Sequence, residues 1–158
     1  MPKMKWFELT PLQLGRYAEY YAKMEFASYG FEVYTSEVDD HGVDFIVKYP
    51  GTSIFYEIQV KGKGKSNYVF EPKDKMPLSE NRILCLLDFQ EGKLPDVYLI
   101  PTLEWKNPNG VLVDREYNKP GQKSKPEWGI NVSAKNLPAL EKYSASRIFE
   151  KLIPTNQR

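Results

Sequence analysis

Two neighbouring strands joined by a tight turn, predicted between Asp44 and Lys61, constrain the fold more than any other part of the sequence. The apolar runs at residues 45–47 and 54–56 indicate that both strands are substantially buried, and the Pro-Gly-Thr-Ser segment at residues 50–53 supplies the turn. A buried pair of this kind belongs at the centre of a sheet.

The second strand of this pair carries polar side chains on one face. Successive side chains of a strand point to opposite faces, so Glu57, Gln59 and Lys61 share one face while the apolar residues between them share the other. Asp44 enters the first strand of the pair. A carboxylate, an amide and a lysine therefore converge on the central sheet.

A helix is predicted before these strands, from Thr10 to about Tyr29. Thr10 provides a capping hydroxyl and the proline after it is favoured in a first turn, while Gly30 suits the helix end. Residues at helical spacing form one apolar stripe, namely Leu14, Ala18, Tyr21, Ala22 and Phe26. Glu19 lies beside this stripe, and it either points past small residues into the protein or occupies an exposed edge of the helix.

The remaining sequence predicts a single α/β domain over residues 1–158. Further strands are expected at residues 31–35, 68–70, 83–89, 97–100 and 128–132. The other expected elements are a small hairpin with its turn at Asn109-Gly110, a mobile loop at 116–127, a helix over 136–142 capped by Asn136, and a last helix over 146–152.

Composition places the chain among ordinary globular proteins. Its 158 residues are 41% hydrophobic and 27% charged, with a formal net charge of +1, which gives no global argument for nucleic acid. No apolar stretch approaches 18 residues, so we expect a cytoplasmic protein with no membrane partner. Cys85 is predicted to be a buried apolar residue, and a single cysteine with a single histidine, His41, excludes structural zinc. His41 is expected in a surface turn, with a role near a metal-bound water as the alternative.

Lysines gather directly after the polar strand. They are Lys63, Lys65, Lys73 and Lys75, and a second basic group at residues 115–125 follows later. Each group is either a solvated loop or a contact surface for the phosphates of a nucleic acid. Because the first group adjoins the polar strand, we predict that it binds nucleic acid.

The polar residues match the needs of phosphodiester hydrolysis. That reaction requires a nucleophilic water and stabilisation of charge on phosphate oxygens, and carboxylates that hold Mg²⁺ or Mn²⁺ provide both. Asp44 is the expected main ligand, joined by the amide oxygen of Gln59, a backbone carbonyl near Val60 and Glu19. Lys61 then orients or deprotonates the water, or counters phosphate charge.

The order of these residues resembles the PD-(D/E)XK nuclease superfamily, which has the restriction-endonuclease-like fold. The resemblance covers about residues 10–100 and is carried by Gly15-Arg-Tyr-Ala-Glu19, Gly42-Val-Asp44 and Gln59-Val-Lys61. It implies an N-terminal helix, a central mixed sheet of about five strands flanked by helices, and metal-dependent cleavage of nucleic acid, with DNA as the expected substrate. A hairpin, a loop and helices over about 101–158 then form the periphery.

Position 59 departs from the superfamily pattern, which has an acid there. With Gln59 only Glu19 and Asp44 remain as acids, so weaker metal binding is expected. Glu57, about 7 Å along the strand from Gln59, either reaches the edge of the metal site or supports Lys61. The competing interpretation is a buried salt-bridge network in which Lys61 pairs with Asp44 or Glu57.

Three functions remain open from the sequence. The first is a metal-dependent nuclease in defence or repair, acting as a homodimer or with a separate specificity subunit. The second is an inactive nuclease fold that binds nucleic acid, against which the joint presence of Asp44, Gln59 and Lys61 speaks. The third is a protein-interaction module built on an exposed aromatic patch around Trp105, Tyr117 and Trp128.

Overall fold

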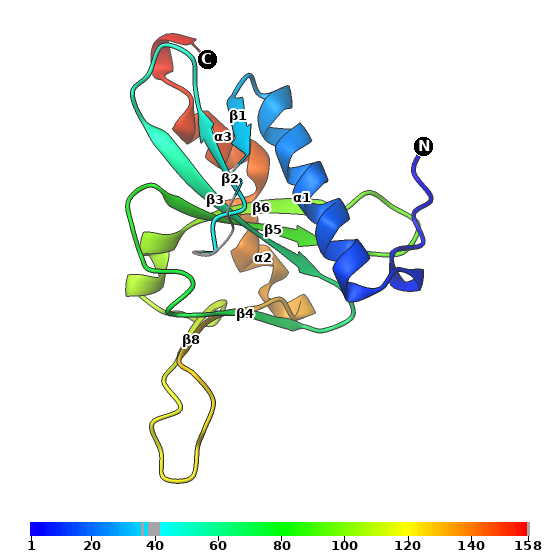
Figure 1. Cartoon of the computed structure of the whole chain (residues 1–158). Helices are drawn as coiled ribbons and strands as arrows, with labels where there is room; N and C mark the ends of the chain where they lie inside the picture. The colour runs from blue at the N-terminus through cyan, green and yellow to red at the C-terminus, as the bar shows by residue number, and fades with distance from the viewer. Residues whose placement is uncertain (36, 38–41, 158) are drawn as a thin grey trace.

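A mixed five-stranded sheet forms the centre of the protein in the computed structural model, which describes residues 1–35, 37 and 42–157 (Figure 1). Its strands lie in the order β1-β2-β3-β5-β6, with β3 and β5 parallel and the other neighbours antiparallel. The strands are β1 (Glu32–Thr35), β2 (Phe45–Lys48), β3 (Phe55–Lys63), β5 (Arg82–Asp88) and β6 (Asp96–Pro101). The predicted α/β class, with a mixed sheet of about five strands, is confirmed.

The predicted strand pair is β2 and β3. Phe45 lies opposite Ile58 in the antiparallel register, and both side chains are fully buried. Gly51 has a φ of +82°, a left-handed conformation that glycine adopts without steric cost, in the predicted turn. β3 continues two residues beyond the predicted end at Lys61.

Helix α1 (Pro11–Ser28) begins with a complete capping box. The backbone N–H of Gln13 donates to Thr10 Oγ1 (3.2 Å), and the backbone N–H of Thr10 donates to Gln13 Oε1 (2.9 Å). The predicted helix is confirmed, and Gln13 is the part of its cap that the sequence analysis did not anticipate. Gly30, with a φ of +91°, follows the helix end.

Helix α1 packs its apolar stripe directly against β3. Ala18, Ala22 and Phe26 are fully buried, and a Cβ atom at Gly62 would lie 3.6 Å from Ala18 Cβ. Small residues on both elements therefore bring the helix close to the strand. Phe26 also meets Phe149 of α3 (Ala145–Leu152), with ring centroids 5.0 Å apart, so both helices share one core.

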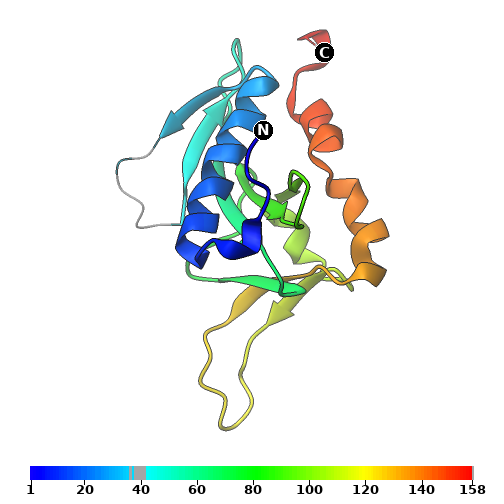
Figure 2. The ribbon, with the colours of Figure 1, turned by 90° about the vertical axis from the view of Figure 1, so that its right-hand side faces the viewer.

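A second sheet contains β4 (Tyr68–Pro72), β7 (Leu112–Arg115) and β8 (Glu127–Asn131), in the order β4-β8-β7. The connection between β7 and β8, residues 116–126, projects away from the body of the protein (Figures 1 and 2). We call it the projecting loop. The sheet joins β4, from the predicted core, to two strands of the predicted periphery.

The hairpin predicted at Asn109-Gly110 is wrong. Asn109 Oδ1 instead accepts hydrogen bonds from the backbone N–H groups of Val111 and Leu112, each 2.8 Å long, and β7 then pairs with β8. The segment before the turn is a 3₁₀ helix, Thr102–Lys106, rather than a strand. The asparagine side chain thus starts a strand whose partner lies much further along the chain.

The C-terminal helices follow the prediction with one correction. Helix α2 spans Leu137–Leu140 and continues as a 3₁₀ helix, Glu141–Tyr143, while α3 covers the last predicted helix. Asn136 does not cap α2 with its side chain, because its Nδ2 donates to the carbonyls of Asn131 (3.1 Å) and Gly110 (3.3 Å). It ties α2 to β8 instead.

Two smaller predictions concern single residues. Cys85 is fully buried in β5, as expected, whereas His41 lies outside the described residues. Within the described ranges, no helix combines the length and the apolar character needed to cross a membrane.

Replacing Phe26 by alanine tests the shared helix core. Phe26 is fully buried against Phe45 and Phe149, so Phe26→Ala should lower the free energy of unfolding by about 3–5 kcal/mol, measured by urea denaturation. Met24→Ala on the same helix is the control, because Met24 is 57% exposed and should change stability by less than about 0.5 kcal/mol. Equal losses in both variants would contradict this packing.

Candidate active site

Asp44 lies where β2 separates from β3. Its backbone N–H donates to the carbonyl of Ile58 (2.8 Å), and its carboxylate Oδ2 accepts from the backbone N–H of Val60 (2.6 Å). A side-chain carboxylate thus takes the place that a backbone carbonyl would occupy if the strand pairing continued. This hydrogen bond holds the Asp44 carboxylate at the edge of β3.

Glu19 of α1 faces the same cleft as Asp44. The cleft has a volume of about 240 Å³ and is lined by Glu19, Asp44 and Val60 together with Pro11, Leu12, Gly15 and Arg16. Glu19 is mostly buried, with 20% of its side chain exposed, and its carboxylate pairs with Lys23 (3.2 Å) and Arg16 (3.7 Å). Two carboxylates predicted to act together therefore share one cleft.

The donors at this cleft fit a hard divalent cation. Carboxylate oxygens, backbone carbonyls and water are the ligands that Mg²⁺ and Mn²⁺ prefer, and Mg²⁺ commonly uses only one or two protein carboxylates. In the described part of the chain, no group of three or more His, Cys, Asp or Glu residues is arranged to hold a metal. Among the described residues, Glu19 and Asp44 are the acids that line the cleft.

Gln59 lies in a different environment, between a carboxylate and a guanidinium. Its side chain is buried, with 3% exposed; its Nε2 donates to Glu71 Oε2 (2.8 Å), and its Oε1 accepts from Arg82 Nη1 (3.2 Å). Charge fixes the amide orientation, because the reverse orientation would set oxygen against carboxylate and nitrogen against guanidinium. The amide oxygen proposed as a metal ligand is therefore directed at Arg82.

Lys61 pairs with Glu71 rather than with Asp44 or Glu57. Its Nζ donates to Glu71 Oε1, and Glu71, on β4, exposes 13% of its side chain. One carboxylate thus contacts both Gln59 and Lys61. Glu71 was not predicted as a site residue, because no periodic pattern in the sequence connects a residue of the second sheet to the polar face of β3.

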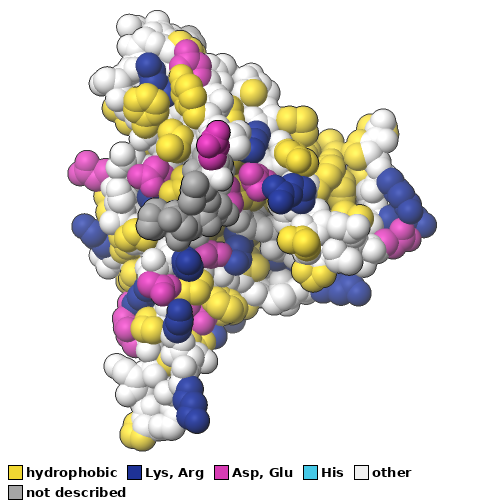
Figure 3. Space-filling model, viewed as in Figure 1, with side chains coloured by type: hydrophobic (Ala, Val, Ile, Leu, Met, Phe, Trp, Pro, Cys, Tyr) yellow, Lys and Arg dark blue, Asp and Glu magenta, His cyan; other side chains and the backbone are white. Residues whose placement is uncertain are grey.

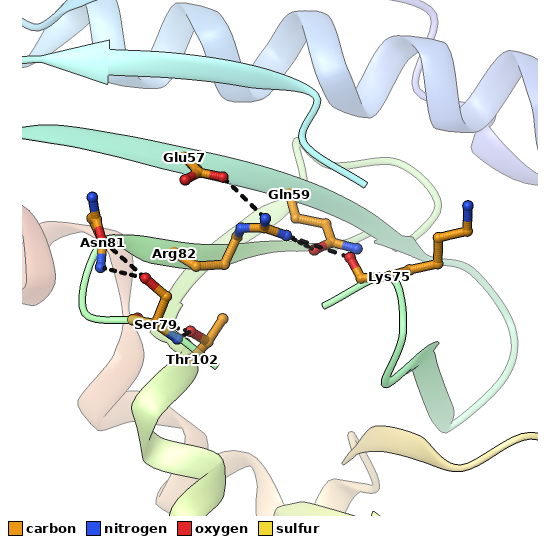
Figure 4. A network of polar contacts seen from close by, with 7 residues as sticks. All are labelled: Glu57, Gln59, Lys75, Ser79, Asn81, Arg82 and Thr102. Atoms are coloured by element: carbon orange, nitrogen blue, oxygen red, sulfur yellow. Dashed lines mark hydrogen bonds and ion pairs between the residues drawn. The ribbon is translucent and has the colours of Figure 1, made fainter. Parts of the chain in front are cut away.

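Arg82 organises the other end of the polar face (Figure 4). It lies opposite Glu57 in the parallel register, and its Nη2 contacts Glu57 Oε2 at 3.0 Å. Arg82 is buried, whereas Glu57 exposes 38% of its side chain. Nη1 of Arg82 also lies 3.4 Å from the carbonyl oxygen of Lys75. Glu57 therefore supports Arg82 in this structure, and Arg82 was not predicted from the sequence as a site residue.

The predicted nucleic-acid lysines divide into two kinds. Lys63 forms a largely buried ion pair with Asp88 (3.2 Å), and Lys73 pairs with Asp114 (2.5 Å) and Glu116. Burial opposes the charge of Lys73, but these carboxylates raise its pKa above the ordinary value. Lys65 and Lys75 are exposed. The paired lysines hold strands and loops together, while the exposed pair is accessible to a ligand.

The projecting loop carries basic side chains in solvent. Residues 118–126 are all exposed and include Lys119, Lys123 and Lys125 with no Asp or Glu; Figure 3 shows Lys or Arg side chains along this loop. At its base, Tyr68 donates to Glu127 (2.5 Å), and burial together with this carboxylate raises the pKa of Tyr68. Glu127 is thus engaged by Tyr68, whereas the exposed Asp74 lies 3.4 Å from Lys125 of the loop.

The tryptophans of the C-terminal half do not form an exposed aromatic patch. Trp105 is buried and its Nε1 donates to the carbonyl of Gly129 (3.0 Å). Trp128 is partly buried; its Nε1 donates to the carbonyl of Met76 (3.1 Å), and Lys73 Nζ lies 4.0 Å from its ring. Both indoles stabilise the second sheet, so the surface expected for a protein-interaction module is not found there.

Solved structures with the same arrangement are nucleases by name. Hjc, a Holliday junction resolvase from the archaeal hyperthermophile Archaeoglobus fulgidus, has a TM-score of 0.57 at 13% identity, over 89% of this chain and 98% of its own. The bacterial homing endonuclease I-Ssp6803I has a TM-score of 0.54 at 16% identity, over 91% and 95%. No protein-family profile and no curated protein matches the sequence. The chain therefore has the restriction-endonuclease-like fold, as its resemblance implied.

Arg82 should contribute strongly to stability. Arg82→Met leaves the buried Gln59 oxygen and Glu57 without their guanidinium, so we expect a loss of about 3 kcal/mol in the free energy of unfolding, measured with urea. The same change at Arg16, whose side chain is 62% exposed, should cost less than about 0.5 kcal/mol. A loss at Arg82 no larger than the loss at Arg16 would refute this role.

Proposed function

We propose that this chain, which has the restriction-endonuclease-like fold, is a metal-dependent nuclease that hydrolyses phosphodiester bonds in DNA, in defence or in repair. The observation that carries the proposal is the cleft shared by Glu19 and Asp44 at the point where β2 leaves β3. The fold adds support, because the two named structures that share it are a resolvase and an endonuclease.

Glu19, Asp44 and the backbone carbonyl of Val60 are the groups that would hold Mg²⁺ or Mn²⁺. Such a cation polarises a phosphoryl oxygen and lowers the pKa of water. Asp44 is already positioned for this task, because Val60 N–H fixes one of its carboxylate oxygens. Glu19 is held by Arg16 and Lys23 on the other side of the cleft.

We propose that Lys61 contacts the scissile phosphate and stabilises its negative charge during hydrolysis. Hydrolysis bonds a water oxygen to phosphorus and breaks the bond to one ester oxygen, which then takes up a proton. An ammonium directed at the phosphate stabilises the negative charge that develops on it. The Lys61 side chain is 33% exposed, so it is accessible to a ligand despite its pairing with Glu71. Gln59 and Glu57 complete the proposed site because both hold Arg82. Gln59 also holds Glu71.

We propose that the nucleic acid lies along exposed lysines rather than along the paired ones. Lys65 and Lys75 flank the polar strand, and the projecting loop offers three further exposed lysines, of which Lys125 forms an exposed ion pair with Asp74 (3.4 Å). Such a surface binds phosphates by charge alone, and it releases the counterions that surround the nucleic acid.

A second candidate is a nuclease fold that binds nucleic acid without cutting it. It is favoured by the contacts of Gln59 and Lys61, which have protein partners in Glu71 and Arg82. The two candidates share the basic surface and differ in whether Asp44 and Lys61 are needed for cleavage.

A cleavage assay separates these candidates. With Mn²⁺ or Mg²⁺, the wild type should cut single- or double-stranded DNA, and Asp44→Asn and Lys61→Met should each slow cleavage by about 100-fold or more. Asp96→Asn and Lys106→Met make the same changes at exposed positions and should cut like the wild type. The nuclease proposal fails if the wild type leaves DNA and RNA intact, or if the two site variants cut at its rate.

The projecting loop should contribute to binding through salt-dependent contacts. Replacing Lys119, Lys123 and Lys125 together by alanine should weaken binding to a DNA duplex in the absence of divalent cation. The plot of log association constant against log salt concentration should become less steep by about 2–3, because each lost phosphate contact removes about 0.9 from the magnitude of the slope. The triple variant at Lys106, Lys135 and Lys151 makes the same change in charge elsewhere on the exposed surface and is the control. Equal slopes for the two triple variants would show that the loop lysines do not contact the phosphates of the DNA.

A further inference from the structure

We infer that Glu71 positions Lys61 for its role and that its carboxylate, held by Gln59, balances the charge of that lysine. This inference rests on the proposed nuclease function. Its basis is geometric, because each Glu71 oxygen contacts one polar member of the Gln59-Val-Lys61 segment: Oε2 accepts from Gln59 Nε2 (2.8 Å), and Oε1 accepts from Lys61 Nζ.

Glutamine at position 59 and glutamate at position 71 form a matched pair. A glutamate at position 59 would bring two carboxylates to about the 2.8 Å that now separates the amide nitrogen from Glu71, in a setting where residue 59 is 3% exposed. Two such carboxylates cannot both stay ionised at low cost. The amide avoids this repulsion, because it donates to Glu71 and accepts from Arg82. This pair therefore holds a single carboxylate, and that carboxylate lies on β4 rather than on β3.

Close packing keeps the Gln59 amide in this position. A Cβ atom at Gly42 would lie 3.0 Å from Gln59 Nε2 and 2.4 Å from the carbonyl of Lys75. Gly42, with a φ of +79°, therefore lets the segment that leads to Asp44 pass directly over the amide. The residue that supplies the main carboxylate and the residue that contacts Glu71 are thus parts of one packed unit.

Glu71 also sets the charge around Lys61. Lys61 follows Val60, which lines the cleft of Asp44 and Glu19. Without Glu71, the Lys61 ammonium would lack its carboxylate partner, and its positive charge would weaken binding of a cation in that cleft. β4 pairs with β8, Glu71 lying opposite Trp128, so this carboxylate belongs to the sheet that carries the projecting loop. The second sheet thereby contributes to the site on the first.

The test exchanges the two side chains in the full chain. Glu71→Gln removes the carboxylate, Gln59→Glu adds a second one, and the double variant Gln59→Glu/Glu71→Gln moves it across the pair at constant charge. Calorimetric titration with Mn²⁺ should show about tenfold weaker binding for Glu71→Gln, and the double variant should return to within about threefold of the wild type. Cleavage should follow the same order through kcat, with little change in KM for DNA.

Glu127→Gln is the matched control. Glu127 is a buried carboxylate of the same second sheet, where it accepts from Tyr68, so its loss tests structural damage alone. It should lower the melting temperature without changing Mn²⁺ affinity. Gln59→Glu should also melt at a lower temperature than the wild type, because it sets two carboxylates against each other in a buried position.

The possible results distinguish this inference from the nuclease proposal. If the wild type cuts DNA and Glu71→Gln binds Mn²⁺ and cuts equally well, the role of Glu71 is refuted while the nuclease proposal stands. If Mn²⁺ affinity falls in Glu71→Gln and recovers in the double variant although no form cuts DNA, the role of Glu71 stands and the nuclease proposal fails. If the double variant binds Mn²⁺ no more tightly than Glu71→Gln, the carboxylate at position 59 does not replace the one at position 71, and the role of Glu71 is refuted as well.

Discussion

The packing of α1 against β3 is the contact on which the candidate site depends. Ala18 and Gly62 are small enough to let the helix lie close to the strand, and Ala22 and Phe26 bury the rest of the interface. Because Glu19 follows Ala18 directly, this close approach brings its carboxylate to the cleft of Asp44. Hydrophobic packing on one face of β3 thus decides where an acid from a different element lies.

The opposite face of β3 shows how buried polar groups are accommodated. From Glu57 to Lys63, each polar side chain that points to this face has a partner on β5 or β4, namely Arg82, Glu71 or Asp88. A buried charge without such a partner would be costly, so these contacts are required for folding whatever the function. Function then depends on which of these groups keep access to a ligand, and Lys61 is more exposed than Lys63.

The second sheet contributes residues to the candidate site that were expected to come from the first sheet and α1 alone. Its strand β4 provides Glu71, and its strands β7 and β8 carry the projecting loop. Trp105 and Trp128 stabilise this sheet through hydrogen bonds to backbone carbonyls. The region beyond residue 101 therefore supports the candidate site and a basic surface together. In the proposed nuclease, binding of the nucleic acid and positioning of Lys61 involve the same sheet.

Local patterns in the sequence determined the elements and the fold class. The alternation along residues 55–61, the Thr10 cap and the apolar run of β5 each express a preference of neighbouring residues, so α1, the β2–β3 pair and the α/β class were predictable from them, while the mixed sheet was implied by the family resemblance. Tertiary structure alone decided the partners: Glu71 for Lys61, Arg82 for Gln59, and β8 rather than residues 102–107 for β7. The physical reason is that periodicity specifies the face on which a side chain lies, whereas the group opposite it is brought there by chain folding between residues distant in sequence.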